Sequence, residues 1–389
     1  MKKIQPANRV NDIKEYYFSK KLRELAKLNS EGADIISLGI GGPDRAPSSK
    51  VIETLQREAE IEGNHSYQSY IGIPELRKAF ADWYKEKYGV TLNPDNEILP
   101  LIGSKEGILH ISMAFLNPGD GVLVPDPGYP TYTSVSKLVG ADIYTYDLKE
   151  ENGWLPDFEA LEKLPLDKIK LMWVNYPHMP TGREADMETF RKIIDFGKKH
   201  GIVIAHDNPY SFILNKEPKS ILQVEGAKEI AIEMNSLSKS HNMAGWRVAM
   251  AASNPTFISW IFKVKSNIDS GQFKPVMLAA TKALKLEKDW YEQLYNVYSE
   301  RRKIAEDIMK ELECTYDPAQ RGLFLWGKVA DTIPSGEWLA DELFYKAKVF
   351  VTPGFIFGKN GDRYIRISLC ATPEKLNESL QRIKNYKKI

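Results

Sequence analysis

Short apolar runs alternate with amphipathic helical patterns through the middle of the chain, and this alternation restricts the fold more than any other sequence feature. Met187–His200 is one such helical pattern between two apolar runs. Strands that alternate with helices are typical of a mostly parallel sheet with helices on both faces. The sequence therefore predicts an α/β fold. The candidate strands are Glu97–Ile102, Val122–Pro125, Lys170–Asn175, Ile202–Ala205, Glu229–Met234 and Arg247–Ala252.

The C-terminal part has a different pattern. Asp289–Glu313 has the pattern of one long, charged amphipathic helix, and short strands and a terminal helix, Pro373–Lys388, follow it. A chain of 389 residues is long enough for two units. We expect residues 46–285 to form a large domain. We expect residues 286–389 to form a small α+β domain. Residues 1–45 should form an N-terminal arm and complete part of this small domain.

Charge and cysteine content restrict the possible partners. The chain has 53 Lys and Arg against 52 Asp and Glu, so neither nucleic acid nor an anionic membrane is an expected partner. The start, MKKIQPANRV, lacks the apolar stretch of a signal peptide, and no apolar run reaches the roughly 20 residues of a membrane span. Cys314 and Cys370 have neither metal-ligand spacing nor a disulfide framework. We therefore expect a cytoplasmic protein without a metal site.

Ligands of such sheets bind beyond the carboxyl ends of the strands, so the residues there are the candidates for chemistry. The segment SLSKSHNMAGWR places Lys239 close to Ser236 and Ser238, with Arg247 eight residues further on. A desolvated lysine can be neutral and nucleophilic, and hydroxyls with a guanidinium can bind a phosphate. The alternatives are a solvated surface lysine and a structural ion pair at Arg247.

Asp207 and Tyr210 follow the fourth candidate strand. A carboxylate beside a pyridine ring keeps the ring nitrogen protonated, and the protonated ring then accepts electrons from a carbanion. A tyrosine three residues on could donate a hydrogen bond to a phenolic oxygen of the same ring. The alternatives are a helix cap for Asp207 and core packing for Tyr210.

Three further turns follow strands. Gly103–Gly107 opens a helical pattern and contains Ser104 and Lys105, and the free N–H groups of a helix start form a phosphate site. The turn Asp-Pro-Gly-Tyr-Pro could project Tyr129 over the sheet to stack on a planar cofactor. An ordinary glycine turn and a core tyrosine are the alternatives. The prolines and glycine of NYPHMPTG, residues 175–182, predict an irregular turn.

One arginine near the C-terminus lies in an alternating pattern. In YIRIS, Arg366 shares a face with Tyr364 and Ser368. If that face points inward, a buried arginine needs an anionic partner. The carboxylate of a substrate and a structural Asp or Glu are equally good partners on this segment alone.

In their order and spacing, these segments resemble the class I and II aminotransferases of pyridoxal-phosphate fold type I. The resemblance runs from SLGIGGPD at residues 37–44 to YIRISL at residues 364–369, and SLSKSHNMAGWR is its most specific part. It implies a pyridoxal 5'-phosphate cofactor held as a Schiff base on Lys239, which becomes a proton shuttle when an amino acid displaces it. It also implies that Asp207 pairs with the ring nitrogen and that Tyr210 donates to the phenolic oxygen.

The same resemblance assigns the remaining site residues. It implies that Tyr129 stacks on the cofactor ring, and that Arg366 binds the substrate carboxylate next to the backbone of Gly41. Tyr67 matches a tyrosine that reaches the phosphate of the neighbouring subunit, which implies a homodimer with shared active sites. The phosphate-binding group implied by the resemblance comprises Ser104, Lys105, Ser236, Ser238 and Arg247.

One position departs from the family pattern. The family usually has Asn-Pro-Thr-Gly, whose Asn donates to the phenolic oxygen, and this chain has Met179 in place of that Asn. A thioether cannot donate a hydrogen bond. Asn175 or Asn208 could take over the missing contact to the cofactor.

Within the family, GSKEGI, NYPHMPTG and KSNIDSGQF look most similar to the LL-diaminopimelate aminotransferase and related broad-specificity branch. This similarity implies substrate contacts from Asn267 and from an N-terminal arm, Tyr16-Tyr17-Phe18, in which Tyr16 is the expected contact. We expect an aminotransferase that moves an amino group from an L-amino acid to a 2-oxo acid, with 2-oxoglutarate as the expected acceptor and ping-pong kinetics.

Two rival functions use the same scaffold. Pyridoxal-phosphate carbon–sulfur β-lyases use the same lysine and eliminate at Cβ without an oxo-acid acceptor. Aminotransferase-like transcription regulators have an added DNA-binding domain, for which the sequence before the first motif at residue 37 offers little room. We therefore keep the lyase as the main alternative.

Overall fold

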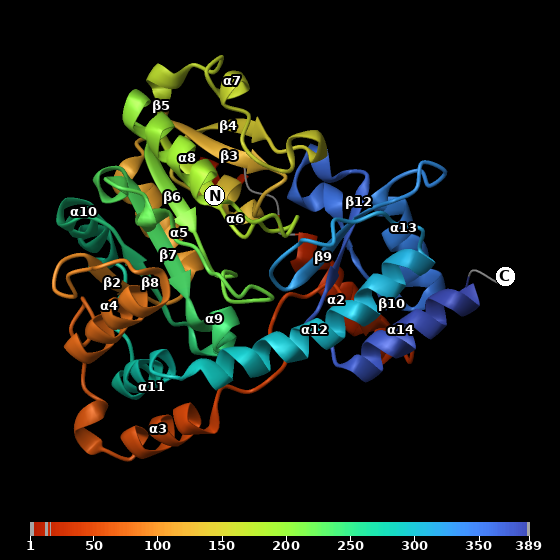
Figure 1. The fold of residues 1–389 in the computed structure, drawn as a ribbon, viewed down its shortest axis with the longest axis horizontal. Coiled ribbons are helices and arrows are strands. Elements are labelled where there is room, and N and C mark those ends of the chain that lie inside the picture. Colours follow the sequence, from red (N-terminus) through yellow and green to blue (C-terminus); the bar gives the residue numbers. More distant parts are fainter. Residues whose placement is uncertain (1–3, 12–14, 16, 387–389) are drawn as a thin grey trace.

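The computed structural model describes residues 4–11, 15 and 17–386. Its centre is a seven-stranded sheet with the order β2-β8-β7-β6-β5-β3-β4 (Figure 1). Within this sheet β8 runs antiparallel to both of its neighbours, and the other pairs are parallel. The strands are β2 Ile98–Leu101, β3 Gly121–Asp126, β4 Asp142–Asp147, β5 Ile169–Asn175, β6 Val203–Asp207, β7 Ala231–Ser236 and β8 Ala249–Ala252.

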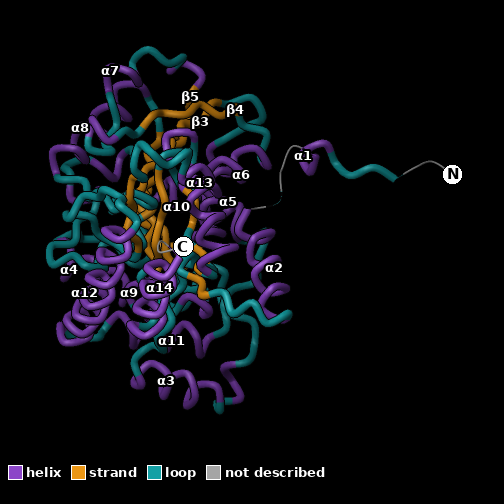
Figure 2. Tube along the Cα trace, turned by 90° about the vertical axis from the view of Figure 1, so that its right-hand side faces the viewer, coloured by secondary structure: helices purple, strands orange, loops and turns teal. Residues whose placement is uncertain are grey.

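Both faces of this sheet are buried, as the apolar runs predict. Along β5, Leu171 and Trp173 belong to one apolar cluster, while Met172 and Val174 belong to the other. Helices α5, α6 and α10 cover the first face, and α4, α8 and α11 cover the second, so the strands lie between helices (Figure 2). These helices are α4 Pro74–Tyr88, α5 Ser104–Phe115, α6 Pro130–Leu138, α8 Met187–His200, α10 Pro255–Lys265 and α11 Lys274–Leu284.

Helix α8 has the bounds that its sequence pattern predicts. The carboxylate of Asp186 accepts a hydrogen bond from the backbone N–H of Thr189, so it caps the first turn. Gly201 follows the last turn in the left-handed region, at φ 65°. Local capping chemistry therefore sets both ends of this helix.

All six predicted strands are present, but several of their ends differ. Strand β7 extends through Asn235 and Ser236, because the Asn235 side chain is hydrogen-bonded inside the core, where its Nδ2 donates to the Tyr88 hydroxyl at 3.1 Å. Arg247 lies before β8 rather than in it, with a left-handed φ of 57°. Strand β4 was not predicted, because this partly exposed edge strand has the polar sequence DIYTYD.

Both ends of the chain build a smaller α+β unit, as expected. Strand β1 from the N-terminal part pairs in parallel with β10, and β11, β12 and β9 form an antiparallel sheet. In the long helix α12, the buried Arg301 binds Asp44 through two hydrogen bonds of 2.7 and 2.9 Å. The elements are α2 Tyr17–Ser30, β1 Ile36–Ser37, α12 Lys288–Glu311, β9 Phe324–Lys328, α13 Gly336–Glu342, β10 Val349–Phe350, β11 Thr352–Pro353, β12 Tyr364–Ser368 and α14 Pro373–Tyr386.

Short helices connect these elements. The short α-helical turns are α1 Asn8–Asn11, α7 Phe158–Leu161 and α9 Leu237–Ser240, beside the longer α3 Ser49–Ala59. A π-helix, η7, covers Leu343–Ala347. The 3₁₀ helices are η1 Glu62–Asn64, η2 Glu150–Asn152, η3 Leu166–Lys168, η4 Ile221–Gln223, η5 Ala227–Glu229, η6 Ala244–Trp246, η8 Gly354–Phe357 and η9 Lys359–Gly361.

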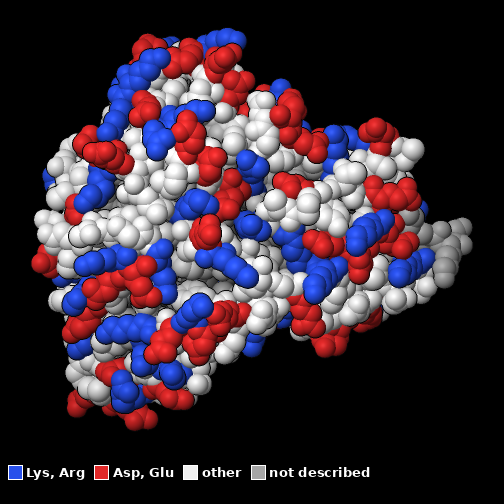
Figure 3. All heavy atoms as spheres, viewed as in Figure 1, with Lys and Arg blue, Asp and Glu red and all other residues white. Residues whose placement is uncertain are grey.

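Acidic and basic side chains alternate over the face seen in Figure 3, in keeping with the formal net charge of +1. Among the described helices, none is both long and apolar enough to cross a membrane.

Candidate active site

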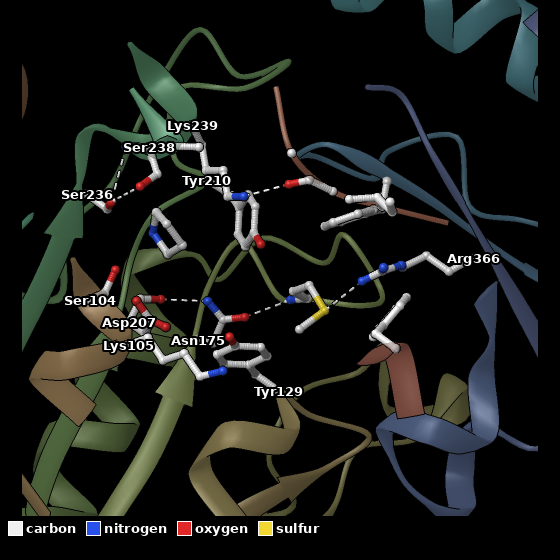
Figure 4. Close-up of a pocket in the computed structure, with 18 of the residues that line it drawn as sticks. Ser104, Lys105, Tyr129, Asn175, Asp207, Tyr210, Ser236, Ser238, Lys239 and Arg366 are labelled. Atoms are coloured by element: carbon white, nitrogen blue, oxygen red, sulfur yellow. Dashed lines mark hydrogen bonds between the residues drawn. The ribbon is translucent and has the colours of Figure 1, made fainter. Parts of the chain in front are cut away.

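A cavity of about 400 Å³ lies at the carboxyl ends of the parallel strands, beside residues 39–42, α2 and β12 (Figure 4). The structure brings twelve of the predicted site residues together around it. In Figure 4, Arg366 lies across the cavity from Ser104, Ser236 and Ser238. The twelve are Gly41, Ser104, Lys105, Tyr129, Asn175, Asp207, Tyr210, Ser236, Ser238, Lys239, Arg247 and Arg366.

Three predicted site residues are not placed in this cavity. Tyr67 is 91% exposed on the surface of this subunit. Asn267 follows the end of α10 and is also exposed. Its side-chain nitrogen donates to the Lys263 carbonyl at 2.8 Å. Tyr16 lies outside the described residues. Asn267 therefore does not contact the cavity of its own subunit, where the sequence predicts a substrate contact.

Lys239 lies in α9, directly after β7. The Ser236 hydroxyl caps this turn by accepting the Ser238 backbone N–H at 3.1 Å. The Lys239 ammonium donates to the Gly41 carbonyl at 2.6 Å, which ties the lysine to the N-terminal segment. Burial lowers the pKa of Lys239. This is the environment that makes an amine nucleophilic.

Asp207 is the last residue of β6 and lies beside Asn175 of β5 in the sheet register. The Tyr132 hydroxyl donates to its Oδ2 at 3.0 Å, and burial raises the pKa of Asp207 to about 6. Its Oδ1 is buried and has no hydrogen-bond partner among the described residues. A buried carboxylate oxygen without a partner on the cavity wall fits a protonated ring nitrogen, so the site passes this test for pyridoxal phosphate.

A polar network supports Asp207 from the other face of β6. His206 Nδ1 lies 2.8 Å from the carboxylate of Glu233, and both side chains are fully buried. Glu233 also accepts hydrogen bonds from the hydroxyls of Tyr84 and Ser220, at 2.7 and 2.8 Å. Because these contacts satisfy the Glu233 carboxylate, the network holds the end of β6 firmly beneath the cavity.

The residues predicted to bind the phosphate gather around the N-terminus of α5. Ser236 and Ser238 are buried, and their hydroxyls are 2.9 Å apart. Gly103 precedes the helix at φ 86°, and a Cβ atom there would overlap the guanidinium of Arg247. The glycine therefore lets Arg247 approach the positive helix end, where free N–H groups, hydroxyls and a guanidinium suit a phosphate dianion.

Arg366 is buried in β12 on the opposite side of the cavity. Its Nη2 donates to the Gly39 carbonyl at 2.9 Å, and its Nη1 lies 3.2 Å from the sulfur of Met179. Its guanidinium carbon lies 3.8 Å from the ring centre of Phe324 and 4.6 Å from that of Phe357. The guanidinium is thus held on a mostly apolar wall that borders the cavity.

The two asparagines that could replace the donor lost at Met179 lie in different places. Asn175 lines the cavity, with its Nδ2 donating to the Asp207 carbonyl at 2.6 Å and its Oδ1 accepting the Met179 N–H at 2.8 Å. Asn208 is fully buried outside the lining, and its amide donates to the Lys219 carbonyl at 3.1 Å. Of the two, the geometry favours Asn175, because its second N–H hydrogen remains for the cavity.

Several lining residues were not predicted from the sequence. Tyr132, which contacts Asp207, stacks on Trp173 with an angle of 5° between the rings. Its place, three residues after Tyr129 on one face of a helix start, is the signal that could have identified it. Leu22 of α2 also lines the cavity, four residues after Phe18 and on the same helix face, and Phe18 belongs to the N-terminal arm expected from the sequence.

One ionisable cluster lies outside the cavity. Glu106, His110 and Asp269 bring their ligand atoms within 4.8 Å of one another. The Lys265 ammonium lies 2.8 Å from Asp269 and supplies a positive charge there. The cluster thus joins α5 to the end of α10 through charged side chains.

Comparisons with known proteins agree with this geometry. A family model for the class I and II aminotransferases matches residues 33–383. The chain is 41% identical to the LL-diaminopimelate aminotransferase of Aquifex aeolicus and 40% identical to that of Dehalococcoides mccartyi. The Aquifex alignment covers 98% of this chain and 99% of the relative, and the Dehalococcoides alignment covers 98% of each. The solved structure of substrate-bound BacF from Bacillus subtilis superposes with a TM-score of 0.93 at 36% identity, over 98% of each chain.

The fold, the cavity and these relatives lead to one family. The resemblance to LL-diaminopimelate aminotransferases expected from the sequence is confirmed at about 40% identity. The cofactor of the family is pyridoxal 5'-phosphate, and Asp207 and Lys239, the residues predicted to hold it, both line the cavity. The chain belongs to the class I and II aminotransferases and is an aminotransferase enzyme.

Proposed function

We propose that this enzyme moves an amino group from an L-amino acid to a 2-oxo acid in two ping-pong half-reactions, with 2-oxoglutarate as the first acceptor to test. Pyridoxal 5'-phosphate supplies the electron-accepting ring and keeps the amino group between the two half-reactions. One observation carries the proposal: Lys239 and Asp207, whose Oδ1 has no hydrogen-bond partner among the described residues, line the same cavity.

Each side chain has one part in this proposal. Lys239 anchors the cofactor. Its neutral amine takes the proton from the Cα of the substrate and delivers it to the reacting carbon of the cofactor. Asp207 keeps the ring nitrogen protonated, and Tyr210 donates to the phenolic oxygen. Arg366 orients the substrate by binding its α-carboxylate, with Gly41 beside it. Tyr129, Asn175, Lys105 and the residues at the start of α5 position the cofactor.

Replacing the proposed anchor tests this function directly. In Lys239→Ala we expect kcat to fall about 1,000-fold or more, since the general base is lost, while the cofactor still binds noncovalently. Borohydride reduction followed by mass measurement should link cofactor to the wild type and not to the variant. Lys282→Ala removes an exposed lysine of α11 and is the matched control. Near-normal transaminase activity in Lys239→Ala would contradict the proposal.

The lyase alternative is less well supported. The relatives described above are named aminotransferases, which favours amino transfer over elimination. Release of pyruvate and sulfide from a cystathionine-type substrate without any oxo acid would reverse this ranking.

We also propose a homodimer whose partner subunit contributes Tyr67. Exposed apolar side chains support it: Tyr67, Tyr70, Ile268 and Phe273 are 91%, 45%, 49% and 43% exposed. The two segments that carry them are adjacent, because the Lys265 ammonium donates to the Tyr70 carbonyl at 3.0 Å. Sedimentation of the holoenzyme tests the dimer, and Tyr67→Phe should weaken cofactor binding if the hydroxyl reaches the neighbouring phosphate.

Two further proposals concern the organisation and location of the chain. The division into residues 1–45, 46–285 and 286–389 is supported by the large sheet, whose seven strands all fall within the second range. A cytoplasmic location is supported by the low cysteine content, which is two residues in the chain, Cys314 and Cys370. Limited proteolysis tests the proposed division, and cell fractionation tests the proposed location.

A further inference from the structure

Arg247, which the sequence predicts to bind the cofactor phosphate, has an unusual backbone. Its φ is 57° and its ψ is 54°, a left-handed conformation that is unfavourable for residues other than glycine. In this conformation its guanidinium packs over Gly103 at the start of α5. A strained backbone persists only where neighbouring groups hold it, so the contacts to the Arg247 main chain bear on the phosphate site.

Gln272 makes such a contact from another part of the chain, 25 residues further on. Its side-chain nitrogen donates to the Arg247 carbonyl at 2.6 Å. Arg247 also donates from its own Nη1 to the Ala244 carbonyl at 2.8 Å. The first contact holds the main chain of Arg247 and the second holds its guanidinium. The two contacts therefore fix both ends of this side chain.

The segment that carries Gln272 is itself held firmly. The Oδ1 atom of Asp269 accepts the Gly271 backbone N–H at 2.9 Å and the Lys265 ammonium at 2.8 Å. Lys265 is buried and also donates to the Tyr70 carbonyl at 3.0 Å. Gly271 has a left-handed φ of 85°, and a Cβ atom there would lie 2.8 Å from a backbone oxygen of the neighbouring segment. Gln272 therefore extends from a rigid support.

The same support reaches the other side of the phosphate position. Glu106 lies in the first turn of α5, and its Oε2 accepts the Ile102 backbone N–H at 2.7 Å. The carboxylate of Glu106, the ring of His110 and the carboxylate of Asp269 bring one atom each within 4.8 Å of one another. His110 is fully buried, and its Nε2 lies 3.1 Å from Glu106. One set of contacts within a single chain thus holds both the start of α5 and the segment that carries Gln272.

We infer that Gln272 is a positioning residue for cofactor binding. Through its hydrogen bond to the Arg247 carbonyl, it keeps the Arg247 guanidinium at the phosphate position, although Gln272 itself lies outside the lining of the cavity. This inference rests on the proposed function and on the phosphate-binding role predicted for Arg247. Because Gln272 acts through that arginine, its effect is confined to ligands that have the phosphate.

Titration of the cofactor-free protein with pyridoxal 5'-phosphate and with pyridoxal, which lacks the phosphate, tests the inference. Gln272→Ala removes the donor, and Gln272→Met removes it while keeping the length of the side chain. Each should raise the pyridoxal 5'-phosphate Kd about three- to tenfold and leave the pyridoxal Kd within about twofold. Gln381→Ala changes an exposed glutamine of α14 and should alter neither Kd. An unchanged pyridoxal 5'-phosphate Kd in both Gln272 variants, or equal weakening of both ligands, would overturn the inference.

Combination with Arg247→Ala separates this role from a general effect on the fold or on subunit association. Arg247→Ala alone should raise the pyridoxal 5'-phosphate Kd about 10–100-fold, since a charge-assisted hydrogen bond is lost. If Gln272 acts through the arginine, adding Gln272→Met to Arg247→Ala should raise the Kd no further. An equal fold increase in both backgrounds would overturn the inference. A wild-type Kd in Arg247→Ala would refute the phosphate role of Arg247, and the inference with it, and would leave the proposed amino transfer standing.

Discussion

The sulfur of Met179 lies 3.2 Å from Nη1 of Arg366, so the methionine at the start of Met-Pro-Thr-Gly contacts the arginine that faces the substrate. The family usually has a hydrogen-bond donor at this position, and methionine has none. The backbone N–H of Met179 is held by Asn175 at 2.8 Å, so the main chain of the turn is anchored as well. The change at this position therefore alters the chemistry of the cavity wall.

Met179→Asn should restore a donor to the phenolic oxygen of the cofactor. A hydrogen bond to a charged oxygen is worth about 1.5–3 kcal/mol, and each pKa unit corresponds to about 1.4 kcal/mol. The donor stabilises the deprotonated form, so the pKa seen in the cofactor absorbance should fall by about one unit. A spectrophotometric titration measures it. Met179→Leu adds no donor and should leave that pKa in place, and an unchanged pKa in Met179→Asn would contradict the prediction.

Tyr132→Phe should weaken catalysis by removing the hydrogen bond to Oδ2 of Asp207. The Tyr132 hydroxyl donates over 3.0 Å and favours the charged carboxylate that keeps the ring protonated. We expect kcat to fall about tenfold, together with a changed absorbance spectrum. Tyr146→Phe is the matched control, because it loses a buried hydrogen bond of 2.7 Å to the Trp173 carbonyl. The control should lose stability and keep the wild-type spectrum.

Asp207 should make the cofactor-free protein less stable as the pH rises. Its folded pKa is about 6, raised by burial, and an unfolded aspartate titrates near pH 4. Between these values the folded state binds more protons than the unfolded state, so the free energy of unfolding falls as pH rises from about 4 to 6. The loss is about 3 kcal/mol and stays constant above that range.

Comparison with Asp207→Asn isolates this contribution from the other carboxylates. Urea unfolding of both cofactor-free proteins from pH 4 to 8 should show the variant gaining relative stability across that window. Parallel pH profiles for the two proteins would show that the carboxylate does not titrate in this way.

Gly103→Ala should weaken cofactor binding. The added methyl group would overlap the Arg247 guanidinium and force it away from the start of α5. Loss of one charge-assisted hydrogen bond to the phosphate corresponds to a Kd about 10–100-fold higher, measurable by equilibrium titration. Gly201→Ala is the control, because it has a similar positive φ of 65° and open space around its Cβ position. An unaltered Kd in Gly103→Ala would mean that Arg247 does not contact the phosphate.

Local pattern accounts for most of the fold. Helix α8 has its predicted bounds because its capping groups are within its own sequence, and the buried strands are visible as apolar runs. Edge strand β4 was missed because it faces solvent and has a polar sequence. The end of β7 was misplaced because Asn235 is stabilised by Tyr88, a residue 147 positions away.

The sequence by itself determined the α/β fold, the family and most of the residues that meet in the cavity, since most of them lie at or just after the carboxyl ends of parallel strands, which share one edge. Only the tertiary structure decided which side chains surround them. Tyr132 reaches Asp207, and Met179, Phe18, Phe324 and Phe357 enclose Arg366, through contacts between distant segments. The physical reason is that strand order is a local pattern, whereas the wall of a cavity forms where separate elements pack together.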